Sequence, residues 1–464
     1  MEQNTKGQWG SSFGFLMAAV GSAVGLGNLW GFPYKMGMNG GFAFLLLYLI
    51  LVVFVGVVIT LGELSLGRKY GKGVIGAYES LNKKYSFIGW FGFISPFLIL
   101  AFYTMLGGYC IKYAVANLGD LFNAGWGVNG ADSGEFFTNF YTNQAETVIY
   151  TLVFVLLTVL IVRGGVSGGI EKFTKIAMPA LFVMLVIVIA RSVTLPGASE
   201  GLKFMFSPDF SVFEGAGWVN VLAAAGGQMF FSLSLGMGIM VTYGSYMKKE
   251  ESLEQNAILI PLADTTIAVM AGLAIMPAVF ASGLDPAGGP GLLFVTLQSV
   301  FDSMGSAGPI FGFLFYALVF IAAITSSISL LETVCSVVMD KREAKGKPHN
   351  RNAVTLIVGA IIAVEAAFIS IDGLGANGLP QIFGQGCWLD TFDLISEGIL
   401  MPLGACYMAI ILPNELVDNE VTLNGNKFKT QKFYDFCIKF VAPIMMVLVL
   451  LGQLDTFFSL GIFG

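Results

Sequence analysis

Residues 11–32, which read SSFGFLMAAVGSAVGLGNLWGF, contain no ionisable side chain over a length that can cross a bilayer. Three glycines, Gly21, Gly25 and Gly27, lie in the middle of this stretch, and each weakens a helix by about 1 kcal/mol relative to alanine. We therefore expect an interrupted helix, whose freed backbone groups must line a cavity or bind something. The alternative is close helix packing, because Gly21 to Gly25 and Gly27 to Gly31 are both GxxxG spacings.

A second stretch, residues 215–247, repeats this peculiarity. It has no ionisable residue, and Ser232-Leu-Ser-Leu-Gly-Met-Gly238 lies in its middle. If five helices are repeated once, the two glycine-interrupted segments occupy equivalent positions. Such a pair indicates an inverted-repeat transporter whose binding site lies at the midplane of the membrane.

The composition supports many membrane crossings, with a mean hydropathy of +0.78 and 12% charged residues. Eleven apolar segments are long enough to span a bilayer: 12–36, 41–67, 87–116, 147–163, 169–192, 219–247, 255–283, 307–341, 352–371, 391–413 and 434–454. We predict an all-α polytopic membrane protein with a single transmembrane domain over residues 1–464. Its expected parts are repeat one (8–192), repeat two (215–413) and an eleventh helix (434–454).

The distribution of cations predicts the orientation in the cell membrane. With a cytoplasmic N-terminus, the inside segments hold 20 of the 24 Lys and Arg residues. Only Lys35, Lys112, Arg191 and Lys203 then lie outside or near the outer helix ends. Cytoplasmic loops carry such an excess of cations, so we expect the N-terminus inside and, with eleven helices, the C-terminus outside.

Several classes of function find no support in the residues. The five cysteines are scattered without metal-ligand spacing, and the only histidine, His349, lies in a charged loop. No paired-carboxylate, nucleophile triad or phosphate-loop arrangement appears in a suitable context. We therefore predict that the chain is not an enzyme.

Two groups of polar residues at membrane depth need an explanation. Asp264 is the sole ionisable residue in 257–280, and a carboxylate there costs about 2.5 to 3.5 kcal/mol on insertion scales. It is a candidate cation ligand, unless it only bonds to nearby helix ends. Thr325, Ser326, Ser327 and Ser329 lie in another apolar run, where the hydroxyls either bond back to their own helix or suit a hard cation such as Na⁺.

Three motifs together resemble those of the neurotransmitter:sodium symporter family. The first is Gly21-Ser-Ala-Val-Gly-Leu-Gly-Asn28 with Phe32-Pro33 and Asn39-Gly-Gly41. The second is Phe231-Ser-Leu-Ser-Leu-Gly-Met-Gly238 with Thr242-Tyr-Gly-Ser-Tyr246, and the third is Thr325-Ser-Ser-Ile-Ser329. The resemblance to this family, here a bacterial member, implies a leucine-transporter-type fold. That fold has a 5+5 inverted repeat, an eleventh helix, and helices 1 and 6 unwound at the midplane.

The resemblance also implies two sodium sites and a substrate site. The first sodium would be held by Ala23, Asn28, Ser232 and Asp264, and the second by Gly21, Val24, Ala322, Thr325 and Ser326. The substrate carboxylate would meet the amides of Leu26 and Gly27 and the hydroxyl of Tyr103, and its amine the carbonyls around Phe231, Ser232 and Ser234. Ala23, Ile99, Met237, Ser326, Ser329 and Leu330 would complete the pocket, with Phe231 as a lid.

The family's gates map less completely onto this chain. Lys6 with Trp9 resembles half of the inner gate, with Asp340 as the acidic partner and Tyr246 alongside. Gly31 stands where the family has an arginine, so Asp393 lacks its usual partner; we expect either Lys35 to replace it or a looser, mainly aromatic outer gate. The role of Glu397 stays open. Gly169 and Pro179 resemble an element whose unwinding lets water reach the second sodium, although a static proline kink is equally compatible.

The resulting prediction is a symporter in which Na⁺ drives uptake of a small neutral, hydrophobic or aromatic amino acid by alternating access. Asp264 stands where many relatives have asparagine, so we expect no need for chloride. The expected partners are a small solute, two sodium ions and the lipid bilayer, without nucleic acid. Alternatives are an aromatic or amine solute that lacks a carboxylate, and a binding sensor that does not transport.

Overall fold

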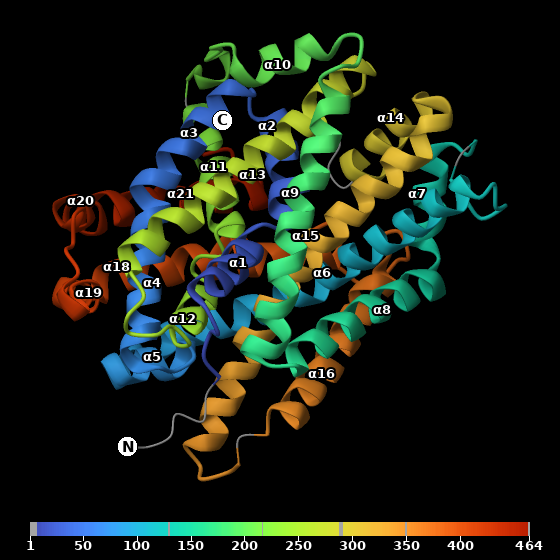
Figure 1. The fold of residues 1–464 in the computed structure, drawn as a ribbon. Helices are drawn as coiled ribbons and strands as arrows, with labels where there is room; N and C mark the ends of the chain where they lie inside the picture. Colours follow the sequence, from blue (N-terminus) through green and yellow to red (C-terminus); the bar gives the residue numbers. More distant parts are fainter. Residues whose placement is uncertain (1–6, 129, 216, 287–290, 349, 463–464) are drawn as a thin grey trace.

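The computed structural model describes residues 7–128, 130–215, 217–286, 291–348 and 350–462. Within these ranges the chain is helical, with no strand (Figure 1). The α-helices are α1 (Ser12–Ala23), α2 (Phe32–Met38), α3 (Phe42–Leu51), α4 (Val57–Tyr70), α5 (Val74–Leu81), α6 (Ser86–Leu121), α7 (Ser133–Thr142), α8 (Gln144–Arg163), α9 (Lys172–Ser192), α10 (Ala198–Phe206), α11 (Gly217–Ser232), α12 (Ile239–Gly244), α13 (Leu253–Ala281), α14 (Leu297–Ser303), α15 (Gly308–Glu343), α16 (Arg351–Asp372), α17 (Trp388–Asp393), α18 (Met401–Ile411), α19 (Asn414–Val421), α20 (Gln431–Phe436) and α21 (Ala442–Phe458).

Several long helices contain π-helical turns, in which one extra residue widens the helix. These turns are η1 (Gly27–Gly31), η2 (Val52–Gly56), η4 (Val166–Glu171), η6 (Leu292–Thr296), η8 (Leu394–Leu400) and η10 (Cys437–Val441). Short 3₁₀ turns are η3 (Lys83–Tyr85), η5 (Ser211–Phe213), η7 (Gly305–Ala307) and η9 (Leu423–Gly425). Turns of this kind often occur at functional sites.

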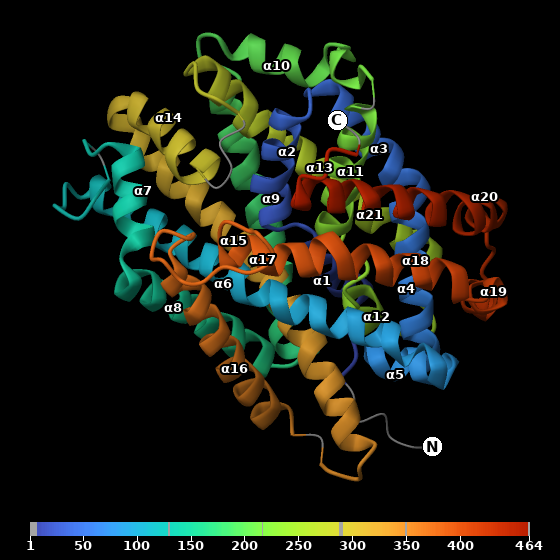
Figure 2. The same ribbon diagram turned by 180° about the vertical axis from the view of Figure 1, so that it is seen from behind.

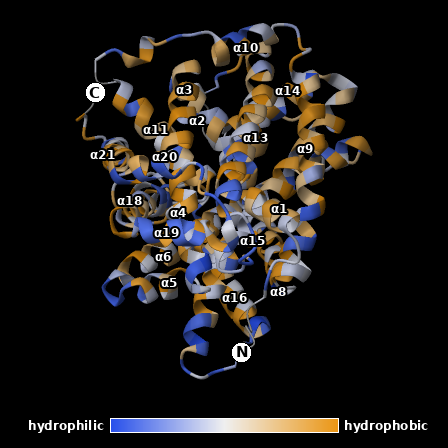
Figure 3. Ribbon diagram, turned by 60° about the vertical axis from the view of Figure 1, so that its left-hand side comes forward, coloured by the Kyte–Doolittle hydropathy of each residue, from blue (hydrophilic) through white to orange (hydrophobic). Residues whose placement is uncertain are grey.

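Nine helical segments of the described chain are long and apolar enough to cross a membrane, and the bent pair Ser12–Ala23 and Gly27–Met38 makes a tenth. The sixth predicted crossing corresponds to α11 and α12, each of which is shorter than a span. Large apolar side chains such as Ile176 and Val364 are 71% and 73% exposed, respectively, as expected for lipid-facing positions. Figure 3 shows apolar residues along the length of the helices, with hydrophilic turns gathered at the end where the chain begins.

The first crossing is interrupted where the glycines predicted a break. Helix α1 ends at Ala23, Val24 adopts an extended conformation with φ −74° and ψ 105°, and helical winding resumes at Gly27. The two halves are bent by 47° relative to each other. The carbonyls of the last turn of α1 therefore lack their usual partners within a continuous helix.

The sixth crossing is interrupted in the same way. Helix α11 ends at Ser232 and α12 begins at Ile239, with turns in between. Ser234, Gly236 and Gly238 have positive φ values of 56°, 76° and 73°. Glycine adopts this conformation freely, whereas Ser234 is a strained position of the kind that clusters at ligand sites.

The two interruptions meet at the centre of the helix bundle. Helix α1 packs against α9, α13 and α15, while α11 packs against α3 and α21. The side-chain amide of Gln228 on α11 donates to the carbonyl of Gly27 at 2.7 Å, so the two broken crossings touch. The long helices α6 and α15 pack along each other beside them, as Figures 1 and 2 show from opposite sides.

Candidate functional site

Four buried polar side chains converge between the first, second, sixth and seventh crossings. The Asn28 side-chain amide donates to Ser232 Oγ at 3.0 Å and to Asp264 Oδ1 at 2.7 Å. Ser232 Oγ donates to Asp264 Oδ2 at 2.8 Å, and the Tyr48 hydroxyl reaches the same oxygen at 3.3 Å. Each of these side chains is at most 1% exposed. The structure therefore brings together the three side chains predicted for the first sodium and adds Tyr48, which the sequence analysis missed.

Asp264 has no Lys or Arg partner among the ion pairs of the described residues. A fully buried carboxylate that carries its charge requires a compensating cation. Its neighbours, an amide and two hydroxyls, offer further oxygen atoms of the kind that hard cations prefer. The carbonyl of Ala23, the fourth predicted ligand, belongs to the last residue of α1 at the break. This donor set fits Na⁺.

A second group of oxygens lies where α1 meets α15. The hydroxyl of Ser326 approaches the carbonyl oxygens of Gly21 and Val24 at 3.4 and 3.2 Å. Thr325 Oγ1 bonds back to its own helix, at 3.0 Å from the carbonyls of both Ile321 and Ala322. The structure thus brings the predicted residues of the second site together. The Thr325 hydroxyl also bonds to its own helix, which is the alternative expected for a hydroxyl in an apolar helix.

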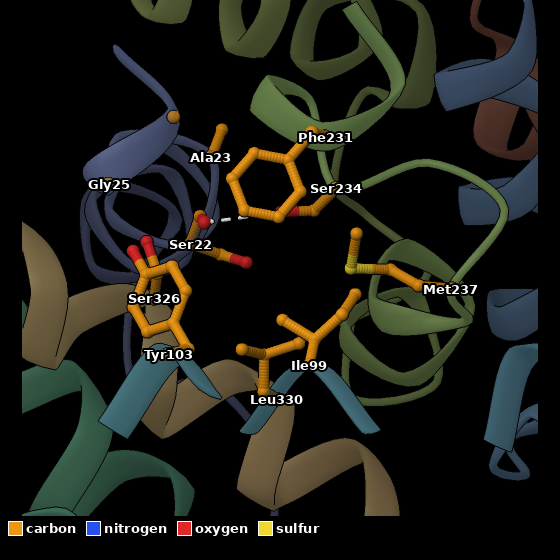
Figure 4. A pocket seen from close by; sticks show the side chains of 11 residues that line it. Ser22, Ala23, Gly25, Ile99, Tyr103, Phe231, Ser234, Met237, Ser326 and Leu330 are labelled. Atoms are coloured by element: carbon orange, nitrogen blue, oxygen red, sulfur yellow. Dashed lines mark hydrogen bonds between the residues drawn. The ribbon is translucent and has the colours of Figure 1, made fainter. Parts of the chain in front are cut away.

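A small cavity lies between the two broken crossings and helices α6 and α15 (Figure 4). It is lined by eleven residues: Ser22, Ala23, Gly25, Gly27, Ile99, Tyr103, Phe231, Ser234, Met237, Ser326 and Leu330. Nine were predicted substrate contacts, and Ser22 and Gly25 are additions. In Figure 4 the Phe231 ring covers one side, Ile99 and Leu330 the opposite side, and Tyr103 and Met237 face each other across the space.

The polar end of the cavity lies at the break in the first crossing. The backbone N–H of Leu26 donates to the Tyr103 hydroxyl at 2.9 Å, which places both groups beside each other. Leu26, Ser232 and Ser329 do not themselves line the cavity, although all three were predicted contacts. Ser329 supports it from behind, because its hydroxyl accepts a bond from Ser22 Oγ at 2.7 Å.

The end of the bundle where the chain begins is closed by a tryptophan and a buried tyrosine. Trp9 is 2% exposed and donates from its indole nitrogen to the Tyr243 carbonyl at 3.2 Å. The Tyr246 hydroxyl donates to Glu332 at 2.7 Å, and Glu332 forms a two-bond ion pair with Arg351, both bonds at 2.6 Å. Sequence reasoning did not predict this closure through Glu332 and Arg351.

The predicted pair of Lys6 and Asp340 is only half visible in the structure. Lys6 lies outside the described residues. Asp340 accepts a bond from the Gly73 backbone N–H at 2.5 Å, and the Tyr246 hydroxyl bonds to Glu332 instead of to Asp340. Asp340 therefore fastens α15 to the start of α5 in this conformation.

The outer ion pair differs from the one expected. Lys35 Nζ contacts Glu397 Oε1 at 2.5 Å, so its partner is Glu397 and the predicted pairing with Asp393 is wrong. Glu397 lies in the π-turn η8, and Asp393 directly precedes this turn. Lys35, Asp393 and Glu397 line a second cavity of about 650 Å³, together with side chains of α11 and α21.

Gly31, which stands where the family has an arginine, lies next to the side chain of Gln228. A Cβ atom at residue 31 would lie 3.0 Å from the Gln228 side-chain oxygen, and Gln228 is fully buried. The glutamine therefore occupies space next to the backbone that a larger residue at this position would need. Of the other predicted elements, Gly169 lies in η4 and Pro179 lies inside α9.

Comparisons with known proteins agree on one family. The model of the sodium:neurotransmitter symporter family matches residues 6–129 and 139–462. An uncharacterized sodium-dependent transporter of Bacillus subtilis, YhdH, is 34% identical over 97% of this chain and 98% of its own. A similar uncharacterized transporter of Haemophilus influenzae is 33% identical over 96% of this chain and 98% of its own.

A solved structure is similar along almost the whole chain. The crystal structure of MhsT in complex with L-phenylalanine superimposes with a TM-score of 0.87 and 38% sequence identity. The match covers 97% of this chain and 100% of that one. The family and these relatives are transporters and not enzymes.

Proposed function

The chain is a sodium-dependent symporter of the sodium:neurotransmitter symporter family, and we propose that it imports a small neutral amino acid with a hydrophobic or aromatic side chain. Two sodium ions would move with each substrate, one bound at Asp264 and one bound at Ser326. The observation that carries it is the buried Asp264 carboxylate, which has no cationic side-chain partner among the described ion pairs and lies beside two broken helices and a cavity.

The polar end of the cavity supports an amino acid rather than an amine. A substrate carboxylate placed at the break would meet the Leu26 amide and the Tyr103 hydroxyl, which already lie 2.9 Å apart. Gly27, the first residue of η1, also lines the cavity, and its backbone N–H would be a second donor because helix N-termini favour anions. Phe231 and Ser234, whose carbonyls we expect to meet the substrate ammonium group, line the cavity from the sixth crossing.

The remaining walls support an apolar side chain. Ile99, Met237, Leu330 and the ring of Phe231 line the part of the cavity away from the break. An apolar wall favours burial of hydrophobic surface by about 25 cal/mol per Å², but distinguishes one methylene by only about 1 to 3 kcal/mol. The bound L-phenylalanine of the MhsT complex is compatible with a pocket of this character.

Chloride independence is also proposed from Asp264. A fixed carboxylate supplies the negative charge that would otherwise come from a bound anion beside the sodium. Two hydroxyls, those of Tyr48 and Ser232, point at this carboxylate. They would be the natural donors to a chloride ion, and here they are engaged by the protein itself.

We propose alternating access in the cell membrane, with the N-terminus cytoplasmic and the C-terminus outside. The Trp9 and Tyr246 contacts then close the inner side, and the Lys35 to Glu397 pair partly closes the outer side. Desolvation of the Glu397 carboxylate, which is 7% exposed, offsets much of the attraction in this pair, and a small net stabilisation suits a gate that opens in every cycle.

A binding screen on the purified protein tests the proposal. Twenty amino acids, simple indoles and simple amines are added in NaCl, KCl and sodium gluconate, and thermal stabilisation is recorded. We expect stabilisation by apolar amino acids in both sodium salts and none in KCl. Binding of amines without a carboxylate would overturn the substrate class. Binding in NaCl but not in sodium gluconate would overturn chloride independence.

A further inference from the structure

A buried carboxylate outside both ion sites and outside the cavity joins the first crossing to the fifth. Glu171, the last residue of η4, is 2% exposed. It accepts bonds from the backbone N–H of Gly10 at 2.6 Å, from Ser11 Oγ at 2.9 Å and from Lys175 Nζ at 2.5 Å. Two of these three bonds come from the segment that leads into α1.

The start of α1 is shaped to fit this carboxylate. Ser11 caps the helix, since its hydroxyl also accepts the Gly14 backbone N–H at 3.0 Å. A Cβ atom at Gly14 would overlap the Glu171 carboxylate, so glycine permits the close approach. The N-terminus of a helix carries a partial positive charge, which adds to the attraction for a carboxylate.

The segment that carries Glu171 is the weakly wound beginning of the fifth crossing. It follows Gly164, Gly165 with φ 85°, Gly168 and Gly169, and it is π-helical from Val166 to Glu171. Glycine weakens helices, and π-turns have looser geometry than α-helix. This end of the crossing can therefore change shape more easily than the α-helix that follows it.

Movement at Glu171 would be transmitted to the ion sites through α1. This helix carries Gly21 and Ala23, and Val24 follows it directly; the carbonyls of all three belong to the proposed sodium sites. Near the second site, a Cβ atom at Gly21 would lie 3.1 Å from Met178 Sδ of α9, so α1 contacts the fifth crossing at both of its ends. A displacement of the segment bonded to Glu171 would therefore shift the carbonyls at the other end of this 12-residue helix.

We propose that Glu171 is a positioning residue that holds the inner half of the first crossing against the fifth while the sodium sites are formed. Its bonds to Gly10 and Ser11 break when the protein opens inward, and α1 then carries its carbonyls away from Ser326. This inference rests on the proposed function, because it assigns Glu171 a step in alternating access. Glu171 contacts neither the substrate nor an ion.

Hydrogen–deuterium exchange of the full-length protein, read by mass spectrometry in NaCl and in KCl, tests this role without an identified substrate. The Glu171→Gln variant keeps the side-chain shape but loses the charge and one acceptor. In NaCl we expect peptides covering residues 10–20 to exchange about tenfold faster than in wild type, the change that follows loss of one charge-assisted hydrogen bond. Peptides of α16 should be unchanged.

Two further variants distinguish loss of the Glu171 contacts from a general loss of structure. Glu251→Gln removes the charge of the carboxylate that Ser12 Oγ contacts on its other side, at 2.6 Å. We expect wild-type exchange from this variant. Gly14→Ala should act like Glu171→Gln, because its methyl group displaces the carboxylate while alanine favours the helix.

Unchanged exchange at 10–20 in Glu171→Gln, or an equal increase in Glu251→Gln, would overturn the inference. If Glu171→Gln does not fold, Gly14→Ala decides in the same way. The proposed function fails separately: wild-type protein whose exchange is the same in NaCl and KCl would contradict the sodium sites. The role of Glu171 is judged from the difference in exchange between variant and wild type in the same salt.

Discussion

Asn28 and Asp264 are 236 positions apart in the chain, yet the side-chain amide of the first donates to Oδ1 of the second at 2.7 Å. The bond joins the break in the first crossing to the middle of the seventh. Both side chains are fully buried. It is the contact through which a cation at Asp264 would sense the conformation of the first crossing.

Replacement of Asp264 by asparagine should weaken sodium binding by about a hundredfold or more, since removing one partner of a buried ion pair costs about 3 kcal/mol or more. The Tyr48 and Ser232 hydroxyls, which point at Asp264, would then be free to donate to an anion. We therefore expect chloride to restore part of the sodium response in Asp264→Asn but to leave wild type unaffected. Thermal stabilisation titrated with NaCl and with sodium gluconate measures both effects, and a wild-type sodium affinity in the variant would contradict the first site.

Tyr103→Phe should weaken amino-acid binding by about tenfold or more, because a hydrogen bond to a charged group contributes about 1.5 to 3 kcal/mol. Tyr109→Phe is the matched control, since Tyr109 lies on the same helix, is fully buried, and has a hydroxyl without a hydrogen-bond partner. Competition binding at saturating Na⁺ gives both affinities. Equal affinities in the two variants would mean that the substrate carboxylate does not reach Tyr103.

Ser326→Ala should raise the sodium concentration needed for half-maximal binding by about fivefold, as expected when one hydroxyl contributing about 1 kcal/mol is lost. Ser327→Ala is the control, because that hydroxyl faces Thr158 at 2.7 Å on the other side of α15. The steepness of the sodium titration should also fall in Ser326→Ala. A sodium dependence identical in both variants would remove Ser326 from the second site.

Lys35→Ala should speed the release of substrate to the outer side, and its effect should exceed that of the double variant Lys35→Ala with Glu397→Gln. The reason is that Lys35→Ala leaves a carboxylate of 7% exposure without its partner, whereas the double variant removes that charge as well. Lys203→Ala, which breaks an exposed pair on α10, serves as the control. Dissociation rates of labelled substrate give the coupling, and purely additive effects would show that the pair has no gating role.

Local composition was sufficient to predict where the first and sixth crossings lose their winding. Glycine and the uncharged surroundings act within a few residues, so the breaks after Ala23 and Ser232 could be foreseen from the chain alone. Asp264 could also be singled out from the sequence, because a carboxylate at membrane depth is costly and needs a binding partner whichever way its helix faces. The family motifs predicted the substrate contacts, and nine of these residues line the cavity.

Partners between side chains on different helices could not be predicted in the same way. Lys35, Asp393 and Glu397 line one cavity, so the sequence leaves open which of the two carboxylates pairs with Lys35, and the structure pairs it with Glu397. Glu171 and Arg351 belong to no motif that the sequence analysis identified, yet they contact Ser11 and Glu332. Such contacts join segments more than 15 residues apart, and the local sequence pattern of one segment does not indicate which other segment it contacts.

Uptake into liposomes that contain the purified protein tests the central claim most directly. An inward Na⁺ gradient is imposed, and the internal concentration of the amino acid that binds best is followed in chloride and in gluconate medium. We predict accumulation above the external concentration in both media, its loss when Na⁺ replaces K⁺ inside, and its loss in Asp264→Ala. Equilibration without accumulation, or accumulation that persists without a Na⁺ gradient, would contradict the account.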